Sequence, residues 1–135
     1  MDFIQNNIFL IAVAFVSGAM LVWPAVRGRA GGPAVSTTDA TTLINREDAI
    51  LVDVREPDEF AKGHILGARN IPLAQLEARA GELEKYKAKP VIVHCETGNR
   101  SASGLATLRA KGFDRAVNLA GGYSAWKQAG LPVEK

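Results

Sequence analysis

Cysteine is nearly absent from this chain, since Cys95 is the only one among 135 residues. One cysteine cannot build an intrachain disulfide framework. There are two histidines, and no cysteine–histidine cluster has the spacing of a zinc site. His94 and Cys95 are neighbours in a predicted strand, where consecutive side chains point to opposite faces and cannot readily share one ion. We therefore expect no metal site and no cofactor.

A strong charge of either sign is also missing. The formal net charge is +2, and no basic cluster accompanies the pI of about 8.9. Nucleic acid is therefore not an expected partner. The apolar content of 47% is typical of a globular protein, and 135 residues are enough for one domain and an appendage.

Charged residues are missing from one long stretch near the N-terminus. Residues 8–23 contain none, and Phe3 to Trp23 spans 21 residues, enough to cross a bilayer core of about 30 Å. We predict a transmembrane anchor helix over residues 1–26, with membrane contact through residues 3–23. A cleaved signal peptide is disfavoured because no Lys or Arg precedes the apolar run. A soluble core helix is disfavoured because the segment is apolar on all faces.

The charges that flank this segment predict its orientation. Arg27 and Arg29 follow it, whereas Asp2 is the only charged side chain on the other flank. The positive-inside rule then predicts a single-pass protein of the cell inner membrane with the domain that follows the anchor in the cytoplasm. Glycine, arginine and proline between residues 27 and 34 predict a flexible linker. Residues 35–135 form the predicted globular domain.

Short apolar runs alternate with helical patterns through this domain. Cap chemistry at Ser36 and a proline at position 57 mark two helix starts, and apolar spacing predicts one amphipathic helix from Leu73 to Tyr86. The alternation predicts an α/β fold with a mostly parallel central sheet and helices on both faces. The strands are predicted at 50–54, 68–71, 91–93 and 116–119.

The stretch from Val91 to Ser101 is the candidate site. It begins as a buried strand, turns at Cys95, and enters a helix that Ser101 is predicted to cap. Open α/β sheets place their sites at this kind of junction. Backbone N–H groups, the helix dipole and Arg100 should lower the pKa of the Cys95 thiol and make it a nucleophile. The alternative is a buried, inert cysteine.

Other residues have competing interpretations. Asp53 lies in an apolar strand, which is costly without hydrogen bonds, so it either braces nearby loops or supports the cysteine loop. Arg55 either adds positive potential near the site or simply pairs with a surface acid. His64 is expected to make a structural hydrogen bond rather than act as a base. Gly121 and Gly122 predict a turn that passes close to the cysteine loop.

The run Cys95-Glu96-Thr97-Gly98-Asn99-Arg100 resembles the active-site loop of single-domain rhodanese-like sulfurtransferases. The resemblance covers roughly residue 35 to the C-terminus. It implies a rhodanese-like fold in which Cys95 takes a sulfane sulfur from thiosulfate or from a small-molecule or protein persulfide. Cys95 then carries a persulfide and passes the sulfur to a thiol or to cyanide. Further matching pieces are Leu51–Arg55, Gly63–Ala68, Asn70–Pro72, Asn118–Gly122 and Trp126.

The same resemblance implies roles for the loop residues. The substrate-binding positions are Glu96, Thr97, Gly98, Asn99, Arg100 and Ser101, with Asp53 and Arg55 in support. Arg100 should orient an anionic donor. Glu96 is acidic where a basic or neutral side chain would best attract thiosulfate, so a protein-bound persulfide fits equally well as the donor.

Two other functions remain open at this point. Cysteine phosphatases and arsenate reductases also hold a thiolate in an amide cradle, but the related phosphatase loops have five residues before the arginine. Here four residues separate Cys95 from Arg100, which leaves little space for a tetrahedral oxyanion. A membrane-tethered, non-catalytic binding module is the second alternative.

Overall fold

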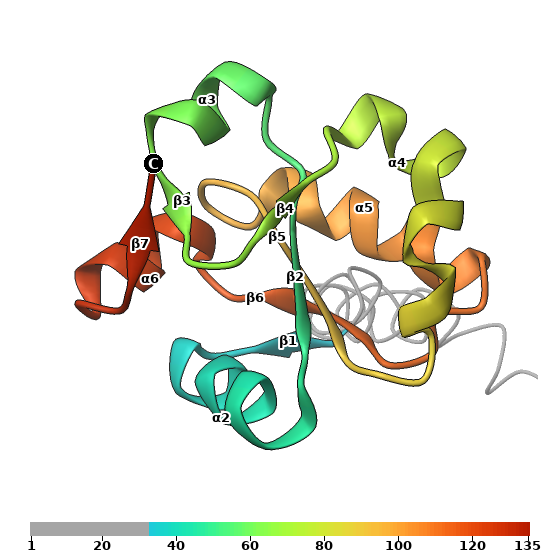
Figure 1. Ribbon diagram of the computed structural model, residues 1–135, viewed down its shortest axis with the longest axis horizontal. Coiled ribbons are helices and arrows are strands. Elements are labelled where there is room, and N and C mark those ends of the chain that lie inside the picture. Colours follow the sequence, from blue (N-terminus) through green and yellow to red (C-terminus); the bar gives the residue numbers. More distant parts are fainter. Residues whose placement is uncertain (1–32) are drawn as a thin grey trace, which may run out of the picture. The chain divides into compact units, whose positions relative to one another are not determined.

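The structure is a computed structural model that describes residues 33–135 (Figure 1). The predicted anchor at residues 1–26 and most of the predicted linker at 27–34 lie outside this range. Within the described part of the chain, no helix has both the length and the apolar character needed to cross a membrane.

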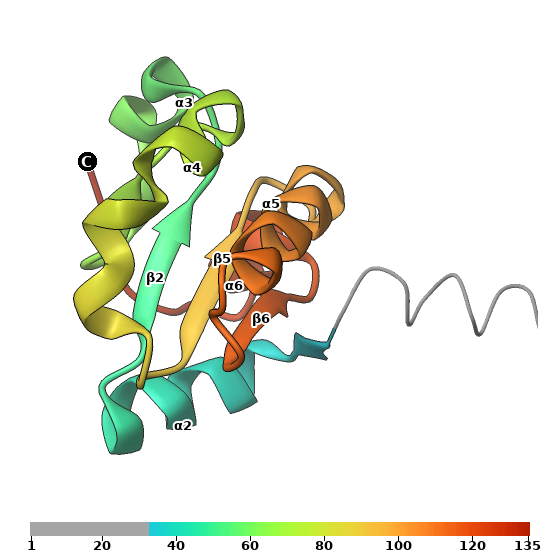
Figure 2. The same cartoon turned by 90° about the vertical axis from the view of Figure 1, so that its right-hand side faces the viewer.

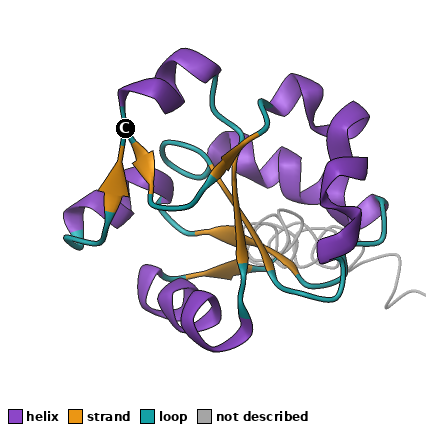
Figure 3. Ribbon diagram, viewed as in Figure 1, coloured by secondary structure: helices purple, strands orange, loops and turns teal. Residues whose placement is uncertain are grey.

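Five strands form a parallel sheet in the order β1-β6-β5-β2-β4. A separate antiparallel pair joins β3 to β7 (Figure 3). The prediction of a mostly parallel sheet is therefore confirmed. The strands are β1 (Ala34–Val35), β2 (Ile50–Asp53), β3 (His64–Ile65), β4 (Arg69–Asn70), β5 (Val91–His94), β6 (Ala116–Leu119) and β7 (Val133–Glu134).

Helices cover both faces of the sheet, as the sequence predicts. Buried residues of α2 and α6 join the cluster on one face, and those of α4 and α5 join the cluster on the other. Figure 2 shows α2 and α4 separated by the strands. The helices are α2 (Thr37–Glu47), α3 (Pro57–Lys62), α4 (Leu73–Arg79), η1 (Ala80–Tyr86), α5 (Asn99–Ala110) and α6 (Gly122–Gln128).

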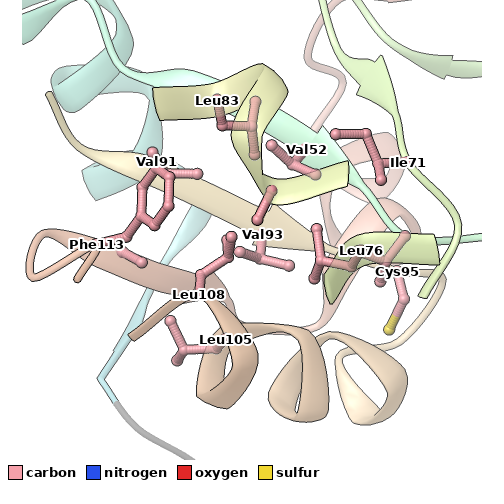
Figure 4. Close-up of a cluster of buried hydrophobic side chains, with 13 residues drawn as sticks. Val52, Ile71, Leu76, Leu83, Val91, Val93, Cys95, Leu105, Leu108 and Phe113 are labelled. Carbon is pink, nitrogen blue, oxygen red and sulfur yellow. The ribbon is translucent and has the colours of Figure 1, made fainter. Parts of the chain in front are cut away.

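Alternating side chains of β5 form the two halves of the core. Val91 and Val93 pack with Leu105 of α5 and with α4, a cluster that also includes Cys95 (Figure 4). Ile92 points to the opposite face and packs with Trp126 of α6. All three β5 side chains are fully buried, and each contributes about 1.5–3 kcal/mol by leaving water. The core therefore holds β5 in the middle of the sheet, with the cysteine at its carboxyl end.

Local sequence signals account for the helix starts. The Ser36 side chain accepts a hydrogen bond from the backbone N–H of Asp39. Pro57 is the first residue of α3, and Glu56 and Glu59 form a capping box around it. This box fixes Glu59 on the side of α3 that takes part in the site.

Two predictions about helices are wrong. The single helix predicted from Leu73 to Tyr86 is instead α4 followed by a 3-10 helix, η1, that contains Gly81, and glycine weakens an α-helix interior. Ser101 does not cap α5. The helix begins at Asn99 after Gly98, whose φ of 109° makes the turn, and this leaves the Ser101 hydroxyl free to face the cysteine.

Candidate active site

Cys95 lies directly after β5, and 1% of its surface is exposed. Its sulfur accepts hydrogen bonds from the backbone N–H groups of Gly98, at 3.0 Å, and of Ser101, at 3.4 Å. The Ser101 Oγ atom lies 3.4 Å from the same sulfur. Figure 4 shows the sulfur at the edge of the hydrophobic cluster. The loop therefore directs hydrogen-bond donors at one sulfur atom.

These donors favour the thiolate. Burial raises the pKa of Cys95, but hydrogen bonds from the Ser101 side chain and from the amides of Ser101, Gly98 and Thr97 lower it by more. The net pKa of the thiol is below its ordinary value, in the direction that the sequence predicts. Cys95 is thus buried yet activated, unlike an inert core cysteine, whose apolar surroundings raise the pKa.

Ser101 connects the sulfur to β6. Its hydroxyl donates to Asn118 Oδ1 at 2.6 Å and lies 3.1 Å from the carbonyl oxygen of Gly98, to which Asn118 Nδ2 also donates at 3.3 Å. A thiol at Cys95 donates to the Ser101 oxygen, and the hydroxyl hydrogen can then go to Asn118 Oδ1. A thiolate instead accepts this single hydrogen, which then leaves Asn118 Oδ1. Asn118 therefore holds the serine in the thiol state, and its Nδ2 holds the turn through the Gly98 carbonyl oxygen.

The opposite side of the loop is held by the start of α6. The backbone N–H groups of Tyr123 and Ser124 donate to the carbonyl oxygens of Cys95 and Glu96, at 2.8 and 2.9 Å. A Cβ atom on Gly122 would lie 2.4 Å from the Cys95 carbonyl oxygen, and this glycine has a φ of 57°. The predicted close approach of the Gly121–Gly122 turn is confirmed, and it requires a residue without a side chain.

Asp53 and Arg55 form a buried ion pair beneath the loop. The Asp53 carboxylate accepts from Arg55 Nη2 at 2.8 Å and from its Nε at 3.0 Å. Arg55 also donates to the Gly63 carbonyl oxygen at 2.7 Å and to Glu96 Oε2 at 3.2 Å. Burial lowers the pKa of Arg55, but the Asp53 contacts outweigh burial and raise it, so the guanidinium stays charged. Asp53 thus supports the cysteine loop through Arg55.

Arg100 lies in the first turn of α5 and reaches across to α3. Its two terminal nitrogens donate to the Glu59 carboxylate at 2.8 and 3.0 Å, a two-pronged ion pair. The hydrogen bonds from Arg100 lower the pKa of Glu59 to about 2. The predicted anion-binding cation therefore already has an anionic partner within the chain.

A cavity of about 250 Å³ lies between α3, the cysteine loop and α6. Lys127 Nζ and Arg55 Cζ lie 4.5 and 4.4 Å from the centre of the Tyr123 ring, within the range of cation–π contacts. The cavity can hold a small polar molecule beside the loop. Its lining residues are Arg55, Glu59, Lys62, Gly63, Glu96, Tyr123 and Lys127.

The two histidines differ in their surroundings. His64 Nδ1 lies 2.9 Å from the Phe60 carbonyl oxygen and its Nε2 lies 3.1 Å from Glu134 Oε1, which confirms the expected structural role. His94 is fully buried with neither ring nitrogen hydrogen-bonded. Burial lowers its pKa to about 4, so its ring is neutral. Residues 33–135 contain no group of three or more acidic, histidine or cysteine side chains placed to hold a metal.

The structure brings the predicted site residues together from two segments. Asp53 ends β2 and Arg55 lies just beyond it, whereas Cys95 and the predicted loop follow β5. Sequence reasoning missed Glu59, Asn118, Tyr123 and Lys127. The sequence predicts a helix start at position 57, which places Glu59 in its first turn but indicates no partner for it. A signal for Asn118 was present in its motif with the two glycines, but the sequence alone did not assign it a contact.

The sequence of this chain is similar to those of known rhodanese-like proteins. The profile of the Rhodanese-like domain matches residues 36–129. An uncharacterised protein of Synechocystis is 43% identical over 68% of this chain and 51% of its own length. A sulfurtransferase of Allochromatium vinosum is 38% identical over 67% of this chain and 83% of its own. A thiosulfate sulfurtransferase of Coxiella burnetii is 32% identical over 69% and 85%. The match therefore spans about half of the Synechocystis relative.

Solved structures give the same fold. A rhodanese-related protein of Thermoplasma volcanium superposes with a TM-score of 0.68 at 32% identity, covering 76% of this chain and 97% of that one. A Rhodopseudomonas palustris protein described as a possible tyrosine phosphatase has a TM-score of 0.68 at 28% identity, with coverages of 76% and 84%. With the profile match over most of the chain, these results show that the protein belongs to the rhodanese-like domain family.

Proposed function

We propose that this protein is a sulfurtransferase that carries sulfur as a persulfide on Cys95. The Cys95 thiolate attacks the outer sulfur of the donor, a new S–S bond forms, and the donor's own bond to that sulfur breaks. With thiosulfate, the electron pair leaves with sulfite. An acceptor, cyanide or another thiol, then takes the outer sulfur and regenerates the thiolate.

One observation carries this proposal. The sulfur of Cys95 accepts hydrogen bonds from the Gly98 and Ser101 amides, and their combined effect lowers its pKa despite burial. The same donors can stabilise the negative outer sulfur of a persulfide without reorganising. Relatives named as sulfurtransferases support the chemistry.

Mass spectrometry of the intact protein provides the test. After incubation with thiosulfate, the mass should rise by about 32 Da, one sulfur atom, as a covalent intermediate requires. The addition should map to Cys95 and disappear on adding cyanide, with thiocyanate as the product. The Cys95→Ser variant should show neither the addition nor turnover, and turnover in that variant would refute the nucleophile.

The same samples distinguish the alternative functions. Hydrolysis of an aryl phosphate without sulfur transfer would assign the protein to the cysteine phosphatases. Neither activity, together with binding to a partner that Cys95→Ser does not change, would indicate a non-catalytic module. The intact Cys95, Arg100 and amide loop favour catalysis over this module.

The natural donor and the cellular location are also part of the proposal. A protein or small-molecule persulfide fits the acidic Glu96 at the loop as well as thiosulfate does. We further propose that residues 1–26 anchor the chain in the inner membrane, with the rhodanese-like domain on the cytoplasmic side, on the basis of the apolar run and Arg27 and Arg29. Resistance of the membrane-bound protein to alkaline extraction, and cleavage of its domain only by protease on the cytoplasmic side, would test this.

A further inference from the structure

The two arginines nearest the cysteine loop are both engaged by carboxylates of the chain. Arg55 is bound by the buried Asp53 and by Glu96, and Arg100 is bound by Glu59. An arginine holds a carboxylate through two parallel N–H donors, and it would hold the oxygens of a sulfonate group in the same way. An anionic donor that binds the same two terminal nitrogens of Arg100 must therefore displace Glu59.

The Glu59–Arg100 pair can open, unlike the pair beneath the loop. The side chains of Arg100 and Glu59 are 40% and 34% exposed, whereas those of Arg55 and Asp53 are 3% and 0% exposed. Ion pairs that face solvent are weak, because water and salt compete with them. Arg100 can thus exchange its carboxylate for another anion, and Arg55 cannot do so without stranding a buried charge.

Arg100 is also within electrostatic range of Cys95. The negative charges of Glu59 and of Cys95 both raise the pKa of Arg100, with the hydrogen bonds to Glu59 the largest cause. One cation therefore serves a carboxylate and a thiolate together. Because the pKa of Glu59 is about 2, its carboxylate stays ionised at any pH where the thiolate forms.

We propose that Glu59 is a specificity-determining residue, an internal carboxylate that competes with anionic sulfur donors for Arg100. This inference rests on the proposed sulfurtransferase function and adds to it a preference among donors. The site disfavours donors in proportion to their negative charge, so the dianion thiosulfate is penalised more than a monoanionic thiosulfonate. Glu96 places a second carboxylate on the same cavity, which acts in the same direction.

The Glu59→Gln variant tests the proposal with little structural change. Glutamine keeps the oxygen that accepts from the Glu56 backbone N–H at 3.1 Å, and it satisfies the capping box as glutamate does. It removes the charge that holds Arg100. Asp58→Asn is the matched control, because Asp58 is an exposed acid in the same first turn of α3 and the change lowers the chain's negative charge equally.

Steady-state kinetics with cyanide as acceptor give the readout. For thiosulfate, KM should fall about 1.4- to fivefold in Glu59→Gln with kcat little changed, which is the strength of exposed ion pairs expressed as an affinity ratio. For methanethiosulfonate, KM should fall by a smaller factor. Release of Arg100 helps both donors equally, but direct repulsion by the Glu59 charge is weaker for the monoanion. The effects should shrink as salt is added.

Each outcome has a defined meaning. An unchanged KM in Glu59→Gln would overturn the proposal, and so would an equal change of KM in Asp58→Asn, because either result would show that Glu59 does not compete at Arg100. An equal change of KM for both donors would also overturn it, because the preference among donors would be absent. Failure of the wild-type protein to gain sulfur on Cys95 at any donor concentration would instead refute the proposed function. If Cys95 gains sulfur normally but the KM for thiosulfate is the same in Glu59→Gln and the wild type, only the role of Glu59 is refuted.

Discussion

Replacing Gly122 with alanine tests how closely α6 holds the cysteine loop. The added Cβ would lie 2.4 Å from the Cys95 carbonyl oxygen and 2.8 Å from that of Glu96. Both are backbone atoms, so they cannot turn aside as the end of a flexible side chain can. The glycine also has a φ of 57°, a conformation that alanine adopts only with strain.

The expected cost has two parts. Left-handed backbone costs an alanine about 1–2 kcal/mol, and overlap in a packed region adds about 1–3 kcal/mol. The free energy of unfolding should therefore fall by about 2–5 kcal/mol, a large share of the about 5–15 kcal/mol typical of a domain. The hydrogen bonds from Tyr123 and Ser124 to the loop must lengthen as the backbone moves away.

Gly130 provides a matched control. It has a φ of 72°, and a Cβ added there would have no neighbour within 4 Å. Gly130→Ala should therefore lose only the conformational part, about 1–2 kcal/mol. Urea unfolding of the two variants and the wild type, compared at a common m value, measures the difference. Equal losses in the two variants would refute the claim that α6 and the loop are in steric contact.

Two further changes have defined outcomes. Ser101→Ala removes the hydroxyl that lowers the pKa of Cys95, so the pH at which the rate of cysteine alkylation reaches half its maximum should rise. Ser103 is exposed on the same helix, and Ser103→Ala should leave this pH unchanged. An equal rise in both variants would contradict the role of the Ser101 hydroxyl. His94→Leu should make the protein less sensitive to acid. Burial lowers the pKa of His94 from 6.5 to about 4, so between these pH values the unfolded chain binds a proton that the folded chain does not. The wild type should therefore lose about 3 kcal/mol of stability as the pH falls from about 6.5 to about 4. Unfolding free energies of both proteins across that interval are the measurement, and an equal acid loss in the leucine variant would show that other groups are responsible.

Local signals in the sequence were sufficient for the centre of the fold. Val91, Ile92 and Val93 are β-branched and apolar because β5 is covered on both faces, so the strand could be predicted from its own residues. The close approach at Gly122 could be predicted because a pair of glycines marks a place where two backbone segments can come together, and the structure shows that contact. That Asp53 has hydrogen-bond partners follows from the cost of an unpaired acid in an apolar strand, but the sequence does not decide which loop it supports.

Contacts between distant segments could not be predicted in the same way. Glu59 and Arg100 are 41 positions apart, as are Arg55 and Glu96. Each pair depends on where α3 and the end of β2 lie relative to the cysteine loop, which no local pattern encodes. The strands β1, β3 and β7 are two residues long, too short to show the alternation by which a strand is predicted. Their pairing is decided by the tertiary fold.

The hydrogen bonds from α6 to the Cys95 and Glu96 carbonyl oxygens also fix which way those peptide groups face. A peptide flip in this segment would turn an oxygen toward the sulfur and replace attraction by repulsion, and it would first have to break a bond to α6. The hydrogen bonds to α6 thus keep the amide hydrogens of the cysteine loop directed at the sulfur. In the proposed cycle, the Cys95 thiolate and its persulfide would therefore meet the same arrangement of amide hydrogens.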